Sequence, residues 1–198
     1  LVNYEIDVDV IFNKKNYEIS PSRTIGISKN NIDFFNSNII NIQKLLWKVK
    51  RIEIYSENLK TEKLINFKSN NDQLFSIIKN YRLYNLLYKD LSKNRSFRSK
   101  FSNEKNFSIL NKYQLIINCD TTNFVTNRYF SKKITKKYNS NAYTTIITHD
   151  QIINDTAFQI FTNKGPLAFL PISNKETSIV YSVHNSKNQK EENIEQLI

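Results

Sequence analysis

The sequence predicts a mixed α/β fold of the α+β kind, in which a few helices accompany an extensive sheet. The C-terminal half contains five short runs that alternate or are apolar, and these runs are rich in the aromatic and β-branched residues that favour strands. The N-terminal half mixes strand-like runs with two segments of helical periodicity. At 198 residues, the chain is long enough to bury the core of one ordinary domain.

The first forty residues predict a strand followed by a helix. Residues 6–12 alternate acidic and apolar side chains, as a half-exposed strand does. A turn or loop follows. Residues 29–40 place Ile32, Phe35 and Ile39 at helical spacing, although their many asparagines lower the intrinsic helix propensity.

Residues 49–93 predict a hairpin, a short strand and the clearest helix of the chain. Residues 49–68 show period-two alternation on both sides of a polar centre, which indicates a hairpin. Residues 73–78 form a short apolar strand. Residues 80–93 carry leucines at helical spacing, with Asn80 as the expected N-cap. Residues 92–107 are polar and basic and predict a loop or a weak edge strand.

The C-terminal half predicts an antiparallel meander. Turn signals at 163–165 and 173–175 each lie between two closely spaced runs, which favours hairpins. Residues 188–198 predict the beginning of a helix that continues past the end of the chain. The five expected strands are 113–119, 141–149, 156–161, 165–172 and 177–183.

Composition narrows the classes of function. The sequence has no methionine and begins at Leu1, so we expect an internal piece of a longer protein. No apolar run reaches the ~20 residues of a membrane span, which predicts a soluble, cytoplasmic protein. The single Cys119 and only two histidines exclude an intrachain disulfide and disfavour a metal site. The net charge of +11 is spread along the chain rather than clustered, which disfavours nucleic acid as a partner.

Two familiar catalytic and nucleotide-binding patterns are missing. Gly26 and Gly165 are the only glycines, so the chain contains neither a G-x-G-x-x-G fingerprint nor a P-loop. Any nucleotide must therefore be anchored mainly by sequence outside this piece. No G-x-S-x-G elbow is present, which disfavours a serine hydrolase.

The segment 161–180, FTNKGPLAFLPISNKETSIV, carries a resemblance to a known family. A strand, a Gly-Pro turn, an apolar strand closed by proline, a polar turn and a further strand resemble the FT-x-x-GPLA-x-LP…SIVW stretch of the ubiquinone-biosynthesis hydroxylases. These enzymes are relatives of 4-hydroxybenzoate hydroxylase. Tyr181 stands where that family commonly has tryptophan.

Upstream segments resemble the same family in the same order. Residues 22–28 resemble its R-[TA]-x-A-[LI]-S segment, and Leu46-Trp47 resembles the end of its GLW helix. Residues 80–87 match the start of its N-x-x-L-x-x-x-L helix. The chain also departs from the family, because Thr121 replaces the glycine of its A-D-G motif and Phe12 lies near the place of its ribose-binding acid.

The resemblance implies part of a Rossmann-like FAD-binding domain, formed by residues 1–47 and 80–135. It also implies an antiparallel substrate-binding sheet of the 4-hydroxybenzoate hydroxylase type, formed by residues 48–79 and 136–187. The implied cofactor is FAD, with NAD(P)H or another reductant and O2. The implied cofactor-binding residues are Arg23, Asn80 and Asp120, whereas the flavin chemistry requires no catalytic side chain from this piece.

The implied reaction is the hydroxylation of a polyprenylated phenol in ubiquinone biosynthesis. The expected substrate pocket consists of Pro166, Leu167, Phe169, Leu170 and Pro171, of which about half should be core because strand side chains alternate. The resemblance also implies a ubiquinone-biosynthesis complex as partner and peripheral contact with the inner membrane. The alternative is a non-enzymatic basic module that binds RNA or an anionic membrane surface.

Overall fold

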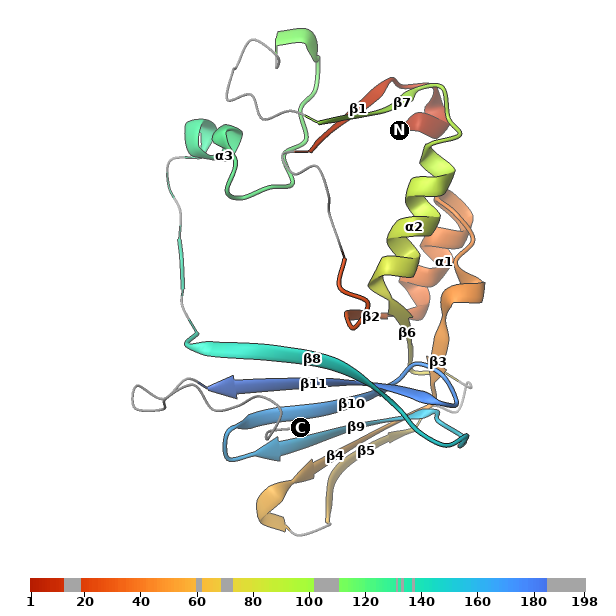
Figure 1. Ribbon diagram of the computed structural model, residues 1–198, viewed down its shortest axis with the longest axis vertical. Helices are drawn as coiled ribbons and strands as arrows, with labels where there is room; N and C mark the ends of the chain where they lie inside the picture. The colour runs from red at the N-terminus through yellow and green to blue at the C-terminus, as the bar shows by residue number, and fades with distance from the viewer. Residues whose placement is uncertain are drawn as a thin grey trace. The chain divides into compact units, whose positions relative to one another are not determined.

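A computed structural model describes residues 1–12, 19–59, 62–68, 73–101, 111–130, 132, 134–136 and 138–184. The chain divides into two compact units (Figure 1). Unit 1 comprises Leu1–Tyr17 and Asn94–Tyr138, and unit 2 comprises Glu18–Lys93 and Asn139–Ile198.

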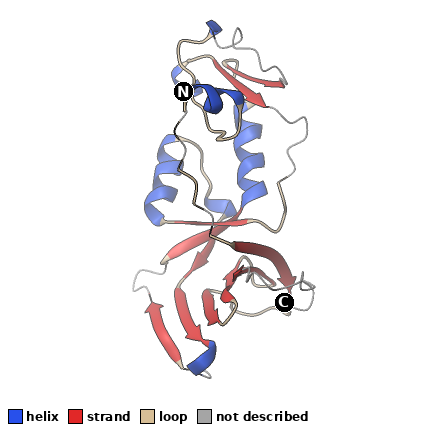
Figure 2. Ribbon diagram, turned by 90° about the vertical axis from the view of Figure 1, so that its left-hand side faces the viewer, coloured by secondary structure: helices blue, strands red, loops and turns tan. Residues whose placement is uncertain are grey.

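Unit 2 contains a small three-stranded antiparallel sheet. Its order is β2-β6-β3, with β2 at Thr24–Ile27, β6 at Phe75–Lys79 and β3 at Trp47–Val49. Helices α1 (Lys29–Asn38) and α2 (Asn80–Leu91) lie on one side of this sheet, and a larger sheet lies on the other (Figures 1 and 2).

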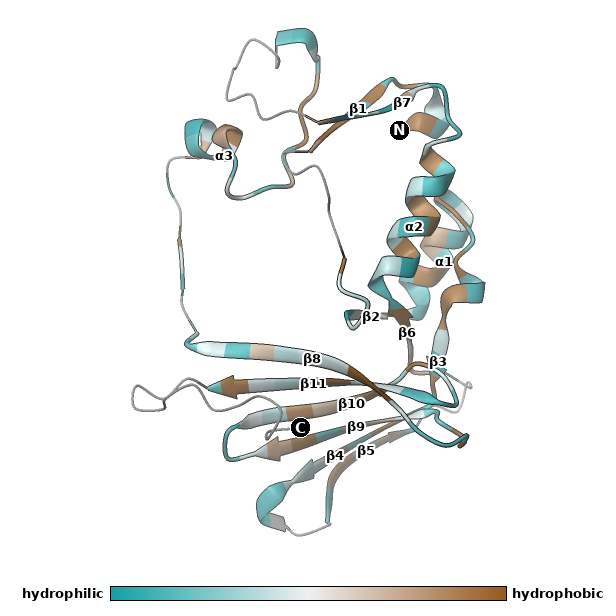
Figure 3. Ribbon diagram, viewed as in Figure 1, coloured by the Kyte–Doolittle hydropathy of each residue, from teal (hydrophilic) through white to brown (hydrophobic). Residues whose placement is uncertain are grey.

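The helices are held on the small sheet by apolar packing. Ile27 of β2, Ile32 of α1 and Ile42 form a buried cluster against which Leu83 and Leu86 of α2 pack. Full burial of a side chain such as Ile32 or Ile42 stabilises the fold by about 1.5–3 kcal/mol. The opposite face of α2 is hydrophilic (Figure 3). The periodic leucines therefore explain both the existence and the orientation of this helix.

The larger sheet of unit 2 has six strands in the order β5-β4-β9-β10-β11-β8. All neighbours are antiparallel except β4 and β9, which run parallel. A second cluster, of Val49, Ile77, Ala157 and Ile172, packs this sheet against the small one. The strands are β4 (Arg51–Ser56), β5 (Lys63–Lys68), β8 (Ser140–Thr148), β9 (Thr156–Thr162), β10 (Gly165–Pro171) and β11 (Glu176–His184).

Unit 1 is built around two parallel strands, β1 (Val8–Phe12) and β7 (Phe97–Phe101). Their register places Asp9 opposite Arg98. The helix α3 (Phe124–Tyr129) begins after Asn123, whose side chain accepts from the Thr126 N–H at 2.9 Å. Short 3₁₀ helices also occur, with η1 (Val2–Tyr4) in this unit and η2 (Gln43–Leu45) and η3 (Glu57–Leu59) in unit 2.

Most of the expected elements are confirmed. The mixed fold, the helices near 29–40 and 80–93, the β4–β5 hairpin and the four strands from β8 to β11 all occur. The expected meander holds for β9, β10 and β11, which follow one another through the predicted turns. It fails for β8, which pairs with β11 rather than with β9.

Other expectations were wrong. Residues 113–119 form no strand, and Leu115 and Ile117 are 72% and 65% exposed, because no described strand pairs with them. The N-cap of α2 is Lys79 and not Asn80, which is already helical. The short helix α3 was not expected. The helix expected at 188–198 lies outside the described residues.

The structure groups the expected domain segments into sheets and units as follows, and their roles in binding FAD or substrate stay predictions. Within 48–79, β4 and β5 belong to the six-stranded sheet, but β6 pairs with β2 and β3. Within 80–135, α2 belongs to unit 2 and the residues from Asn94 belong to unit 1. No helix among the described residues is both long and apolar enough to cross a membrane.

Candidate functional site

Two of the expected cofactor-binding residues, Arg23 and Asn80, are neighbours in the structure. The Asn80 N–H donates to the Arg23 carbonyl at 3.0 Å, and the adjacent residues Thr24 and Lys79 are partners in the β2–β6 ladder. Antiparallel pairing thus brings the start of β2 to the start of α2. We call this place the Arg23–Asn80 corner.

The polar groups of the corner are available to a ligand. Arg23 is exposed, and its guanidinium forms no hydrogen bond or ion pair with any residue that the structure describes. Asn80 is half-buried, and its side-chain amide likewise has no partner within the described part of the chain. Helix α2 also begins without a side-chain cap. A planar cation beside an uncapped helix start suits the oxygens of a phosphate or of a carbonyl-bearing ring.

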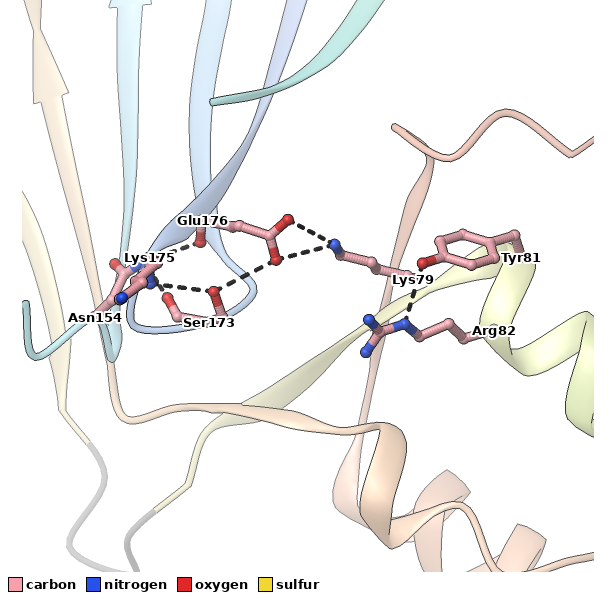
Figure 4. Close-up of polar contacts among 7 residues, drawn as sticks. All are labelled: Lys79, Tyr81, Arg82, Asn154, Ser173, Lys175 and Glu176. Atoms are coloured by element: carbon pink, nitrogen blue, oxygen red, sulfur yellow. Dashed lines mark hydrogen bonds and ion pairs between the residues drawn. The ribbon is translucent and has the colours of Figure 1, made fainter. Parts of the chain in front are cut away.

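A row of polar contacts joins the corner to the six-stranded sheet. We call this row the polar seam. The hydroxyls of Thr24 and Ser178 lie 3.2 Å apart, and the Lys79 ammonium lies 3.0 Å from each carboxylate oxygen of Glu176 (Figure 4). The third contact of the seam joins the hydroxyls of Ser22 and Thr144 at 3.3 Å. The seam therefore sets where the corner lies on the sheet.

Asn154 holds the turn between β10 and β11, next to Glu176 of the polar seam. Its buried amide donates to the backbone carbonyls of Ser173 and Glu176 at 2.8 and 3.1 Å (Figure 4). The indole N–H of Trp47 donates to the Asn154 carbonyl at 2.6 Å. The Leu46-Trp47 match to the hydroxylase family thus falls on a residue that ties the small sheet to the larger one.

The five expected pocket residues of β10 do not share one face. Leu170 pairs with Ser178, so Leu170 and Pro166 point to the side of the polar seam. Leu167 and Phe169 point to the opposite side with their partners on β11, and so does the buried Pro171. The residue between Leu167 and Phe169, Ala168, points toward the seam side.

Of the two expected pocket residues on the seam side, one belongs to the core. Leu170 packs against the cluster that contains Val49 and Ile77. Pro166 lies farther along β10 and is half-buried. A ligand held beside the corner would therefore meet the sheet at Ala168 and Pro166 rather than at Leu167 and Phe169.

The third expected cofactor residue, Asp120, belongs to unit 1, whereas Arg23 and Asn80 belong to unit 2. Its carboxylate accepts from the N–H and the hydroxyl of Thr122 at 2.8 and 2.7 Å, as in an Asx turn. Its backbone carbonyl accepts from the Thr126 hydroxyl at 2.6 Å. Asp120 thus shapes the loop that leads into α3, and its contact with a cofactor stays a prediction.

One polar cluster of the six-stranded sheet has no counterpart among the sequence expectations. Glu53 is buried and accepts from the Lys63 ammonium at 2.6 Å and from the Tyr55 hydroxyl at 2.7 Å. The hydrogen bond from Lys63 holds the pKa of Glu53 below its usual value, and the hydrogen bond to Glu53 raises the pKa of Tyr55. The alternation of β4 indicates that Glu53 and Tyr55 share a face, but it does not indicate that Lys63 is their partner.

FAD is the cofactor that the resemblance implies, and the described residues suit only part of it. The corner offers a free guanidinium, an amide and an uncapped helix start, which fit the anionic and carbonyl-bearing parts of a flavin nucleotide. Gly26 lies within β2 and Gly165 is the first residue of β10, so neither helps to build a phosphate-binding loop. No group of three or more potential metal ligands occurs among the described residues.

Comparison with known proteins identifies the fold. The chain has a TM-score of 0.70 to PqsL of Pseudomonas aeruginosa, a probable FAD-dependent monooxygenase, at 11% identity over 92% of this chain and 55% of that one. It has a TM-score of 0.68 to a variant of HpxO of Klebsiella pneumoniae complexed with FAD, at 10% identity over 98% of this chain and 55% of that one. Neither the protein-family models nor the curated proteins gave a match.

A third solved structure agrees with these two. The 2,6-dihydroxypyridine-3-hydroxylase of Arthrobacter nicotinovorans gives a TM-score of 0.67 at 12% identity, over 94% of this chain and 52% of that one. The chain therefore has the mixed α/β fold of FAD-dependent monooxygenases. It spans little more than half the length of each of these proteins.

Proposed function

We propose that the chain is part of an FAD-dependent monooxygenase that hydroxylates an aromatic ring. In the balanced reaction, the ring, O2, NAD(P)H and a proton give the hydroxylated ring, NAD(P)+ and water. Bound FAD would supply the oxygen-activating redox chemistry, and the protein would supply binding, orientation and the exclusion of water.

The position of the Arg23–Asn80 corner on the six-stranded sheet carries this proposal. Arg23 would hold anionic oxygens of the nucleotide, and Asn80 would donate to or accept from the flavin ring. The polar seam keeps both residues beside one face of the sheet. A flavin bound at the corner would therefore face Ala168 and Pro166 on β10. The aromatic substrate would lie between the flavin and these two residues.

Within this class, we propose a polyprenylated phenol of ubiquinone biosynthesis as the substrate. The support is the segment from Phe161 to Tyr181, whose sequence resembles the ubiquinone-biosynthesis hydroxylases. Its strand–turn–strand order is present as β9, β10 and β11. A prenyl tail needs an apolar surface, so peripheral contact with the inner membrane and a ubiquinone-biosynthesis complex belong to the same proposal.

The test uses the full-length protein in which this chain occurs. We expect it to bind FAD stoichiometrically and to consume NAD(P)H and O2 in the presence of a polyprenylated phenol, with a product that has gained one oxygen atom. A phenol with the same ring and no prenyl tail distinguishes a polyprenylated substrate from a soluble one. If only the soluble phenol is hydroxylated, the ubiquinone role is wrong, and if FAD does not bind, the monooxygenase proposal is wrong.

A basic module that binds RNA or an anionic membrane is the second candidate, and the net charge of +11 is the observation that favours it. It predicts polyanion binding that weakens steeply with salt. Several cations are already paired with carboxylates, including Lys63 with Glu53 and both Arg98 and Lys100 with Asp9. We therefore place the monooxygenase first.

A further inference from the structure

The ion pair between Lys79 and Glu176 lies next to the proposed cofactor-binding corner. Lys79 is the last residue of β6 and the N-cap of α2, so it directly precedes Asn80. Glu176 is the first residue of β11, immediately after the turn at 173–175. The pair thus connects the start of α2 to a strand of the six-stranded sheet that is 97 residues away in the sequence.

The geometry of the pair is well defined on both sides. The Lys79 ammonium is 3.0 Å from Oε1 and 3.0 Å from Oε2 of Glu176, so it bridges the two oxygens (Figure 4). The Lys79 side chain is only 11% exposed, against 34% for that of Glu176. The Ser173 hydroxyl also approaches Glu176, at 3.5 Å. A cation this buried has little access to water, so the loss of its carboxylate partner is costly.

The pair is the strongest contact of the polar seam. The other two contacts join hydroxyls at 3.2 and 3.3 Å, which are neutral hydrogen bonds. Hydrogen bonds between charged groups are roughly twice as strong as neutral ones. Packing of Ile77 fixes β6 on the large sheet, but apolar contacts are not directional. The ladders with β2 and β3 fix β6 within the small sheet, and the Lys79–Glu176 pair is the charged contact that ties its end to the six-stranded sheet.

We propose that the Lys79–Glu176 ion pair is a positioning device that sets the distance between the Arg23–Asn80 corner and the six-stranded sheet. The effect of this distance on the reaction rests on the proposed function, because the same distance would separate the flavin from a substrate on Ala168. In this proposal, neither side chain would touch the reacting atoms. The pair would act by holding Asn80 and, through the hydrogen bond from the Asn80 N–H, the backbone of Arg23.

The experiment compares Lys79→Met and Glu176→Gln with a matched control in the full-length protein. The control is Lys63→Met, which breaks a second lysine–glutamate pair of 2.6 Å that joins β4 to β5 and has no contact with the corner. Hydrogen exchange of residues 22–27 and 79–83 reports the position and order of the corner whether or not FAD is bound. We expect faster exchange there in both test variants and no change in the control.

The second measurement is the fraction of NAD(P)H oxidised that yields hydrogen peroxide instead of hydroxylated phenol. A displaced corner should raise the ratio of peroxide to product about tenfold in Lys79→Met, since small misplacements of reacting groups are costly. The charge-swapped double variant, Lys79→Glu with Glu176→Lys, should recover part of this loss. A merely structural pair would lower thermal stability without changing the ratio.

The outcomes separate the two proposals. Unchanged exchange at the corner in both test variants overturns the positioning role, and so does an unchanged ratio of peroxide to product in an active enzyme. If exchange at the corner rises but the wild-type protein binds no FAD, the positioning role stands and the proposed function is wrong.

Discussion

The Asn80 N–H donates to the Arg23 carbonyl at 3.0 Å, so the start of helix α2 and the residue that precedes strand β2 form one corner. The hydrogen bond uses only backbone atoms. Both side chains are therefore left free for a ligand, and their substitution should not disturb the backbone that holds them.

Arg23→Ala should weaken FAD binding by the full-length protein without destabilising it. We expect the Kd for FAD to rise about tenfold, which corresponds to about 1.4 kcal/mol, because an ionic hydrogen bond to the nucleotide is lost. The Kd of Arg23→Lys should lie between that of the wild type and that of Arg23→Ala, since lysine keeps the charge but not the planar fork. Quenching of flavin fluorescence measures the Kd. Arg95→Ala, at another exposed arginine, is the control, and an equal effect there would refute a specific role for Arg23.

Gly165→Ala should destabilise unit 2. Gly165 has φ of 141°, and a Cβ at this position would lie 1.9 Å from the Ser182 carbonyl oxygen of β11. We expect the free energy of unfolding to fall by at least about 2 kcal/mol, measured by urea denaturation. Gly26→Ala is the matched control, because a Cβ there would meet only the Phe75 ring at 3.5 Å. Equal stability of both variants would show that the β9–β10 turn has another conformation.

Local sequence patterns predicted the elements that depend on local interactions. Leucines at helical spacing predicted α2, and the Gly-Pro turn at Gly165 and Pro166 predicted the hairpin of β9 and β10. The apolar GPLAFLP run predicted the strand β10. In each case, the residues that determine the structure lie within about ten positions of one another.

The long-range relationships could not be predicted in the same way. Nothing near Lys79 indicates that its partner is Glu176, and nothing near β4 indicates parallel pairing with β9. The apolar run around Ile116 suggested a strand, but a strand also requires a pairing partner, which no local pattern can supply. The resemblance to a family identified Arg23 and Asn80, whereas the ladder between β2 and β6 explains why they meet.

Asp9 should make the stability of unit 1 depend on pH. Its side chain is 4% exposed and accepts from Lys100 at 2.6 Å, Tyr113 at 2.6 Å and Arg98 at 2.7 Å. These donors, with Lys100 first, hold the pKa of Asp9 far below its usual value, despite the opposing effect of burial. The stabilisation is therefore present above the unfolded pKa, near 3.8, and is lost as the pH falls below it.

The test compares Asp9→Asn with the wild type by urea denaturation at several pH values. We expect the variant to be less stable at pH 7, and the difference to shrink as the pH is lowered below about 4. Asp90→Asn is the control, because Asp90 is 51% exposed and lies 3.8 Å from Lys93 within a single helical turn. A difference in stability that stays constant with pH would contradict the role assigned to the Asp9 carboxylate.

Ala168→Phe should block the proposed substrate site on the seam side of the six-stranded sheet. Ala168 pairs with Val180 of β11 and points to the face that carries the polar seam, where a flavin at the corner would face the substrate. A phenyl group there would fill the space of an aromatic ring. We expect kcat/KM to fall about 100-fold with little change in the Kd for FAD, because the reacting ring is displaced and the nucleotide is not.

The control for this substitution enlarges a side chain on the other face of the same sheet. Ile147 of β8 pairs with Thr177 and is 38% exposed, so Ile147→Phe adds an aromatic ring away from the seam. It should leave kcat/KM within about twofold, which is less than 0.5 kcal/mol. If Ile147→Phe is as damaging as Ala168→Phe while both variants remain folded by circular dichroism, the substrate lies on the opposite face. Leu167 and Phe169 would then be its contacts, and the flavin would have to approach that face instead of the seam.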